Sequence, residues 1–189
     1  NSVKVTVTDT NGNGVSGKTV TLSADNGAVV AASAVTGSDG SVTVSVTTKK
    51  SGKTTVKATM DSISAQAAVS FVAGAPDTDK SALTVSPDTI VADDTKTSAI
   101  TLTLKDVNNN PAPGQAVTFA TTLDNNKTTI SATTDNGDGT YSATIKGTLA
   151  GKAPVTVKVG GESFAVTGKT VTLAADSSTA KLTNPDAGF

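Results

Sequence analysis

The sequence lacks the side chains on which most enzymatic and metal chemistry depends. None of its 189 residues is a cysteine or a histidine. Without cysteine there is no disulfide, no thiolate nucleophile and no zinc–thiolate site. Without histidine the commonest general base and metal ligand is missing. We therefore predict no catalytic residue, no cofactor-binding residue and no metal site, and we do not expect an enzyme.

The residues that usually anchor tight protein interfaces are also scarce. There is no tryptophan, all 15 basic residues are lysine, and aromatic residues make up 3% of the chain, with Tyr141 the single tyrosine. Because interface hot spots are enriched in Trp, Tyr and Arg, a strongly anchored binding face is not expected, which leaves a weak or extended one. A net charge of −1 argues against nucleic acid as a partner.

Long apolar runs are missing as well. No stretch of 18 consecutive apolar residues occurs, so no transmembrane helix is predicted. The first residues, NSVKVTV, show no basic region followed by an apolar core and do not resemble a signal peptide. An export signal would therefore lie outside this sequence.

Short stretches of alternating apolar and polar residues fill the chain. In Ser2–Thr8, Val3, Val5 and Val7 alternate with polar residues, and Ser41–Val46 repeats the pattern after the turn Ser38–Gly40. This period of two indicates half-buried β-strands, and short strands with turns every 8–12 residues or so are typical of a β-sandwich. The predicted fold class is all-β.

One stretch occurs twice and sets the organisation of the chain. Val7–Leu22, VTDTNGNGVSGKTVTL, matches Leu104–Phe119, LKDVNNNPAPGQAVTF, with Asp106 lying 97 residues after Asp9. One immunoglobulin-like sandwich has about 100 residues, and a repeat of fixed period identifies such an array. We predict tandem immunoglobulin-like β-sandwiches, residues 1–73 and 74–169, joined at the polar, proline-containing linker Ala73–Lys80.

The two ends of the chain do not match this repeat. The first domain lacks the strand that opens the second, Leu83–Val85, and Val171–Ala180 resembles Leu83–Ala92. Residues 170–189 are therefore predicted to be the first strand of a following module, or a tail. One hypothesis is that this strand fills the vacant edge of another copy and gives a strand-swapped oligomer. The alternative is a monomer in which the strand pairs within its own domain or is loose.

Several acidic turns have a functional and a structural interpretation. Asp9–Gly14 fits the opening of a calcium loop, D-x-[DN]-x-[DN]-G, but Val20 stands where the bidentate Glu is required, so an ordinary turn is favoured. Asp77 with Asp79, and Asp93 with Asp94, fit either calcium at the joint between domains or solvated loop charge, and the second is favoured.

Three further positions favour structural roles. Tyr141 follows the turn Asp138–Thr140 and fits the tyrosine corner of immunoglobulin folds, with Val42 in its place in the first domain. Asp135 and Asp138 form a carboxylate pair without a His, an Arg or an apolar pocket to shift a pKa. Asn126–Thr128 is a formal glycosylation sequon that is best explained as a turn.

The motif series of the first repeat resembles the bacterial immunoglobulin-like (Big) repeat domains of the invasin/intimin family of outer-membrane adhesins, the inverse autotransporters. The series is Asp9–Val15, Gly17, Val20–Leu22, Ser38–Gly40 and Gly52–Val56. The second domain departs from it at Asn108–Pro111 and Ala153-Pro154.

The resemblance implies an extracellular segment of a surface adhesin, anchored in the outer membrane, that acts in cell adhesion mainly as a rigid stalk presenting a distal tip. The partners it implies are a host cell-surface or matrix protein, reached through the full-length protein, and the neighbouring Ig-like modules. Two alternatives stay open. In one, the segment itself binds a host protein or glycan. In the other, it is the accessory domain of an exported carbohydrate-active enzyme, for which stacking aromatic residues are too few.

Overall fold

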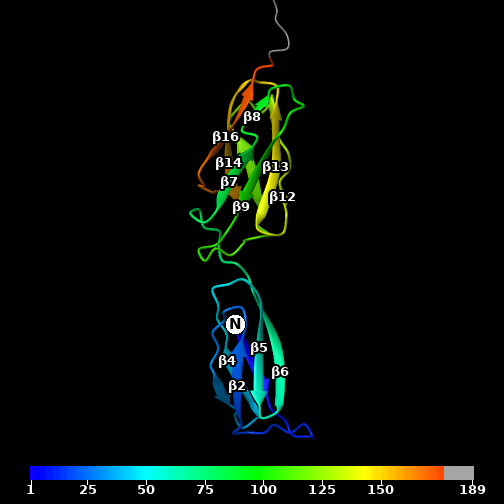
Figure 1. The fold of residues 1–189 in the computed structure, drawn as a ribbon, viewed down its shortest axis with the longest axis vertical. Coiled ribbons are helices and arrows are strands. Elements are labelled where there is room, and N and C mark those ends of the chain that lie inside the picture. Colours follow the sequence, from blue (N-terminus) through cyan, green and yellow to red (C-terminus); the bar gives the residue numbers. More distant parts are fainter. Residues whose placement is uncertain (177–189) are drawn as a thin grey trace, which may run out of the picture. The chain divides into compact units, whose positions relative to one another are not determined.

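The computed structural model describes residues 1–176, and all 16 of its regular elements are β-strands. The chain divides into two compact units, Asn1–Gly74 and Ala75–Phe189, called here the first and the second domain. No helix long and apolar enough to cross a membrane occurs within residues 1–176. The all-β, immunoglobulin-like fold class predicted from the sequence is confirmed (Figure 1).

The first domain has a two-stranded and a four-stranded sheet. The small sheet pairs β1 with β4, and the larger one has the order β3-β2-β5-β6. The strands are β1 (Ser2–Thr6), β2 (Thr19–Ala24), β3 (Ser33–Val35), β4 (Ser41–Ser45), β5 (Gly52–Met60) and β6 (Ile63–Phe71). β5 and β6 form a long hairpin in which Gly52 faces Phe71 and Met60 faces Ile63. All pairings in this domain are antiparallel.

The alternating residues of these strands form the core of the first domain. Its buried members are Val3, Leu22, Val44, Val46, Val56 and Ala58. Valine predominates, which suits strands because its branched side chain packs well on a pleated surface. Each strand therefore contributes one apolar face, as the period of two in the sequence requires.

The second domain contains two five-stranded sheets. One has the order β10-β14-β16-β8 with β15 beside β14, and the other has the order β11-β13-β9-β7 with β12 beside β13. The strands are β7 (Ala82–Ser86), β8 (Thr89–Val91), β9 (Ser98–Thr103), β10 (Val117–Thr121), β11 (Thr128–Ile130), β12 (Thr134–Asp135), β13 (Thr140–Gly147), β14 (Gly151–Val159), β15 (Glu162–Ser163) and β16 (Lys169–Ala174).

The last described strand belongs to the second domain. β16 pairs antiparallel with β14, where Gly151 faces Leu173, and parallel with β8. Val171 and Leu173 are fully buried. A following module is therefore wrong for residues 170–174, because they supply core side chains to their own sandwich. The alternative, a strand that pairs within its own domain, describes them. Residues 177–189, which carry the rest of that prediction, lie outside the described part of the chain.

The loop between β15 and β16 explains the error. In the first domain β6 pairs with β5 without interruption, but in the second domain the corresponding strand is divided into β15 and β16. Gly151 lies 99 residues after Gly52, whereas Leu173 lies 102 residues after Phe71. Three extra residues thus move β16 out of the repeat register that the sequence comparison used.

A close contact between two turns recurs in both domains. In the first domain the Val7 N–H donates to the Gly40 carbonyl at 2.9 Å, and Gly40 has a φ of +74°. A Cβ atom at Gly40 would lie 2.5 Å from the Gly14 Cα. Gly139, 99 residues later, has a φ of +86°, and the Leu104 N–H donates to its carbonyl. Glycine is therefore required at both turns by backbone angle and by space.

We predict that Gly40→Ala destabilises the first domain by about 3 kcal/mol or more, because it combines a strained φ with a clash against backbone. Gly12→Ala is the matched control, because Gly12 also has positive φ but a Cβ there would meet nothing within 4 Å. The control should cost about 1 kcal/mol. Thermal unfolding followed at the methyl group of Met60, the single methionine, reports on the first domain. An equal loss of stability in the two variants would contradict the close contact at Gly40.

Candidate functional site

In the first domain the loop Asp9–Gly14 is held by hydrogen bonds to the Asp9 carboxylate. The Asp9 side chain accepts the backbone N–H groups of Asn11 at 2.9 Å and Asn13 at 2.8 Å, and its second oxygen accepts the Asn13 side-chain amide at 3.0 Å. These hydrogen bonds, led by that of the Asn13 amide, hold the pKa of Asp9 below its usual value. Both carboxylate oxygens are used to hold the turn, as the structural interpretation of Asp9–Gly14 requires.

The second domain repeats this loop with the same partners. Asp106 accepts the N–H groups of Asn108 and Asn110, each at 2.9 Å, and the Asn110 amide at 2.8 Å. Asp106 is buried, with 2% of its surface exposed, whereas Asp9 is exposed. The repeated motif in the sequence therefore encodes a repeated turn, and its aspartate is more deeply buried in the second domain than in the first.

The other acidic residues singled out in the sequence also accept hydrogen bonds from nearby backbone. Asp77 accepts the N–H groups of Asp79 and Lys80, and Asp93 those of Thr95 and Lys96. The two bonds to Asp93, that from Lys96 foremost, lower its pKa to about 2. Such Asx turns fix loop geometry, which is the solvated-loop role favoured for these pairs.

The two carboxylates of Asp135 and Asp138 accept hydrogen bonds from different parts of the chain. Asp135 accepts the Gly114 N–H at 2.7 Å and the Gly137 N–H at 2.9 Å. Asp138 accepts the backbone N–H of Thr140 at 2.9 Å and its hydroxyl group at 2.6 Å, and the hydroxyl is the main cause of a lowered pKa at Asp138. The pair therefore stabilises the turn that precedes β13, and one member ties that turn to the loop before β10.

The structural role predicted for Tyr141 is confirmed, but the predicted tyrosine corner is wrong, because the hydroxyl group bonds to backbone 26 and 29 residues upstream and not a few residues upstream. Tyr141 is 1% exposed, its hydroxyl group donates to the Ala112 carbonyl at 2.8 Å, and its oxygen accepts the Gln115 N–H at 2.9 Å. Burial raises the pKa of Tyr141 above its usual value. The side chain thus fastens the Ala112–Gln115 loop to β13 from inside the sandwich.

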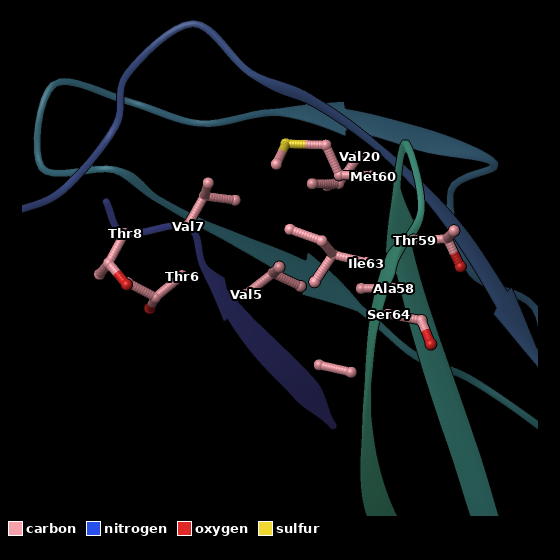
Figure 2. Close-up of a pocket in the computed structure, with 11 residues that line it drawn as sticks. Val5, Thr6, Val7, Thr8, Val20, Ala58, Thr59, Met60, Ile63 and Ser64 are labelled. Carbon is pink, nitrogen blue, oxygen red and sulfur yellow. The ribbon is translucent and has the colours of Figure 1, made fainter. Parts of the chain in front are cut away.

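An apolar groove in the first domain is the feature that our sequence analysis did not identify. It lies between β1 and the β5–β6 hairpin, and its larger part has a volume of about 200 Å³. Figure 2 shows Val5, Val7 and Ile63 pointing into it, while Thr59 and Ser64 point away. A second part of about 120 Å³ continues along Val3, Ala65 and Ala67. The groove therefore follows the length of β1.

The side chains of β6 explain why the groove is open. Its groove-facing residues include Ala65 and Ala67, which are exposed, and Ile63 is 66% exposed. The sequence of Ile63–Phe71 predicts a strand. The small side chains of its alanines were the signal in the sequence that the groove-facing side of β6 leaves space uncovered.

The two domains match two families of known sequence. Residues 1–72 match the bacterial Ig-like domain (group 1), and residues 77–176 match invasin, domain 3. The class of protein is therefore a pair of bacterial immunoglobulin-like domains. The chain belongs to the invasin/intimin family of bacterial surface adhesins, as the sequence motifs predicted.

Individual relatives agree with this assignment. The inverse autotransporter adhesin YeeJ of Escherichia coli K12 is 33% identical over 96% of this chain, which spans 8% of YeeJ. The crystal structure of invasin, described as a bacterial integrin-binding protein, is 37% identical over 93% of the chain and 36% of that structure, with a TM-score of 0.57. The Escherichia coli adhesin FdeC is 25% identical over 92% of the chain and 58% of that structure, with a TM-score of 0.80.

The chain thus spans a minor part of YeeJ and of the invasin structure, and about three fifths of the FdeC structure. It is an Ig-like segment of an adhesin that is exposed at the cell surface, consistent with the surface location of its relatives.

We predict that Tyr141→Phe destabilises the second domain by about 1–3 kcal/mol, because the Ala112 carbonyl loses its donor and the Gln115 N–H its acceptor. Urea unfolding followed by far-UV circular dichroism measures the loss, and the Met60 methyl signal should show the first domain unchanged. Because the folded-state pKa is raised, the wild-type domain should also lose stability above about pH 10, and the variant should lack that loss. Equal stability of both proteins would contradict this role of the Tyr141 hydroxyl group.

Acid should weaken the second domain partly through Asp93. Its pKa is about 2 in the folded domain against 3.8 for the unperturbed group, so its contribution is present above pH 3.8 and is lost as pH falls toward 2. Asp93→Asn keeps an acceptor oxygen for the two backbone bonds but does not titrate. The difference in melting temperature between wild type and variant, followed by Tyr141 fluorescence, should shrink from pH 5 to pH 2. Parallel pH curves would contradict this assignment.

Proposed function

We propose that this segment is a spacer in a bacterial surface adhesin, with no enzymatic activity of its own, and that it holds a distal binding region away from an outer-membrane anchor. The observation that supports the proposal is that the acidic side chains are engaged in hydrogen bonds within the domains themselves. Asp9, Asp77, Asp93, Asp106 and Asp138 all accept hydrogen bonds from their own loops.

The cores support the same role. Each domain buries its own set of apolar residues, with Val46 and Val56 at the centre of the first and Ile100 and Leu102 in the second. Modules with separate cores can be repeated along a chain, because the stability of such an array is close to a sum over repeats and their interfaces. Lysine, serine and threonine on the outer strand faces keep such modules soluble and discourage edge pairing.

A second candidate function is that the segment itself binds a host protein or glycan. The apolar groove beside β1 favours it, since exposed apolar surface frequently marks interaction sites. The description of invasin as integrin-binding makes a host cell-surface protein the first class of partner to test. The full-length protein would reach that partner through this segment rather than beyond it.

The two functions predict opposite results for the purified segment. The spacer proposal predicts no saturable binding of residues 1–189 to epithelial cells, matrix proteins or integrin ectodomains. It also predicts that the full-length adhesin keeps its adhesion when this segment is replaced by two unrelated Ig-like domains of equal length. A variant shortened by one domain is the control for length. Saturable binding that unlabelled segment competes away would overturn the spacer proposal.

A further inference from the structure

The strand that follows β2, or its counterpart β10, joins a different sheet in each domain. In the first domain β3 pairs with β2, so that Thr19 faces Val35. In the second domain Val117 of β10 lies 97 residues after Val20 of β2, but the next strand, β11, pairs with β13 of the opposite sheet. Within the described residues, β10 and β11 are therefore edge strands of the two sheets of this sandwich.

A cleft of about 330 Å³ lies between β10, β11 and the loop that connects them. It is lined by Phe119 and Thr121 of β10, by Thr128 and Ile130 of β11, and by Asn125 of the loop. The four strand residues are at least partly buried and alternate with exposed neighbours, as inward-facing residues do. The cleft thus lies where the chain crosses from one sheet to the other.

The wall of this cleft contains a buried hydroxyl group without a hydrogen-bond partner. Thr128 is 4% exposed, and its Oγ1 atom makes no hydrogen bond within residues 1–176. An unpaired buried polar group destabilises a fold, so such groups are rare and each one requires an explanation. A polar ligand in the cleft would supply the missing partner.

Two further polar side chains of the cleft are unengaged. In the part of the chain that the structure describes, neither the Asn125 carboxamide nor the Thr129 hydroxyl group makes a hydrogen bond. The corresponding loop of the first domain differs, because the Asn26 carboxamide donates to the Ser51 carbonyl and to the Thr54 hydroxyl group, each at 3.3 Å. The cleft therefore offers polar groups that the fold itself does not use.

None of the residues that line the cleft is charged. Nearby charges are engaged elsewhere: the Asp124 carboxylate accepts the Asn126 N–H at 2.9 Å. Lys146, which faces Thr129 across the sheet, has its ammonium group 3.3 Å from the Asp94 carboxylate. A ligand that fits the cleft is therefore neutral. It both donates and accepts hydrogen bonds, since hydroxyl and carboxamide groups do both.

We propose that the cleft between β10 and β11 binds a neutral sugar residue of a glycan. The hydroxyl groups of a pyranose donate to and accept from side chains such as those of Asn125, Thr128 and Thr129. The C–H face of the sugar ring is apolar and packs against the ring of Phe119, which is partly exposed. A volume of about 330 Å³ lies at the lower end of the range of small-ligand pockets.

This inference goes beyond the spacer function and does not depend on it. A single sugar residue has few atoms, so its dissociation constant in such a cleft is of the order of 1 mM. Binding that weak does not make one segment adhere to cells. The tests of the spacer function and of the sugar site therefore succeed or fail independently.

The experiment titrates the 189-residue chain with N-acetylglucosamine, galactose, glucose and mannose, followed by the amide signals in NMR spectra. The signals of Asn125, Thr128 and Thr129 should shift saturably with one of these sugars, with a dissociation constant of the order of 1 mM. Signals of the first domain should not change. Glucuronic acid, the charged counterpart of glucose, should bind more weakly than the neutral sugar.

Two variants test whether the side chains form the site. Asn125→Ala should weaken sugar binding by about three- to tenfold, the effect of one hydrogen bond. Asn126→Ala is the matched control, because Asn126 is the next residue of the same exposed loop and does not line the cleft. Thr128→Val should weaken binding without lowering the melting temperature of the second domain, because the hydroxyl group makes no hydrogen bond in the fold.

Equal binding by Asn125→Ala and Asn126→Ala would overturn the proposal, as would the absence of any saturable shift with the four sugars. A lower melting temperature of Thr128→Val with unchanged sugar binding would also overturn it, and would assign the hydroxyl group to a buried water molecule. Neutral oligosaccharides of epithelial glycoproteins and polysaccharide of the bacterial outer membrane are the larger probes. The one that binds more tightly identifies the source of the sugar.

Discussion

The inward burial of the strand that opens each repeat, β1 or β9, is the constraint on which the rest of each sandwich depends. Its alternating apolar residues must be covered from the opposite sheet and along its free edge. In the second domain Leu102 and Leu104 are fully buried because β7 and β8 join both sheets. In the first domain the same face borders an open groove at Val5 and Val7. Within the described residues, the presence of β7 and β8 in the second domain thus accounts for the main difference between two otherwise repeated folds.

The polar residues that recur in both repeats stabilise the loops. Asp9 and Asp106 close the same turn with the same three hydrogen bonds, and Gly40 and Gly139 allow a second turn to approach it closely. The Tyr141 hydroxyl group ties the loop Ala112–Gln115 to the core of the second domain, and the buried Thr36 hydroxyl group holds the corresponding loop in the first domain through Val15 and Lys18. A domain whose loops are held by their own side chains suits a module that is repeated for length, which is the basis of the proposed spacer role.

The sequence was sufficient for the fold class and the repeat, because these depend on local patterns: a period of two and a fixed repeat distance. It predicted a structural role for Tyr141 but not the partners of its hydroxyl group, because these lie 26 and 29 residues away along the chain. It was misleading at Lys169–Ala174, where three extra residues shift β16 against the repeat, and strand pairing across a loop of that kind leaves no local signal. The sequence also did not indicate the groove. The exposure of Ile63 depends on which segments meet in space, and covered and uncovered strands show the same alternation of apolar and polar residues.

The burial of this strand is tested most directly by amide hydrogen exchange on the unmodified chain, compared between the two repeats. We expect the amides of Ser2, Lys4 and Thr6 to exchange much faster than those of their counterparts Ala99, Thr101 and Thr103, which face β7. The amides of Val5 and Leu102, which face β4 and β13, should both be protected. Equal protection of the two sets of three would contradict it, because the free edge of β1 would then already be paired.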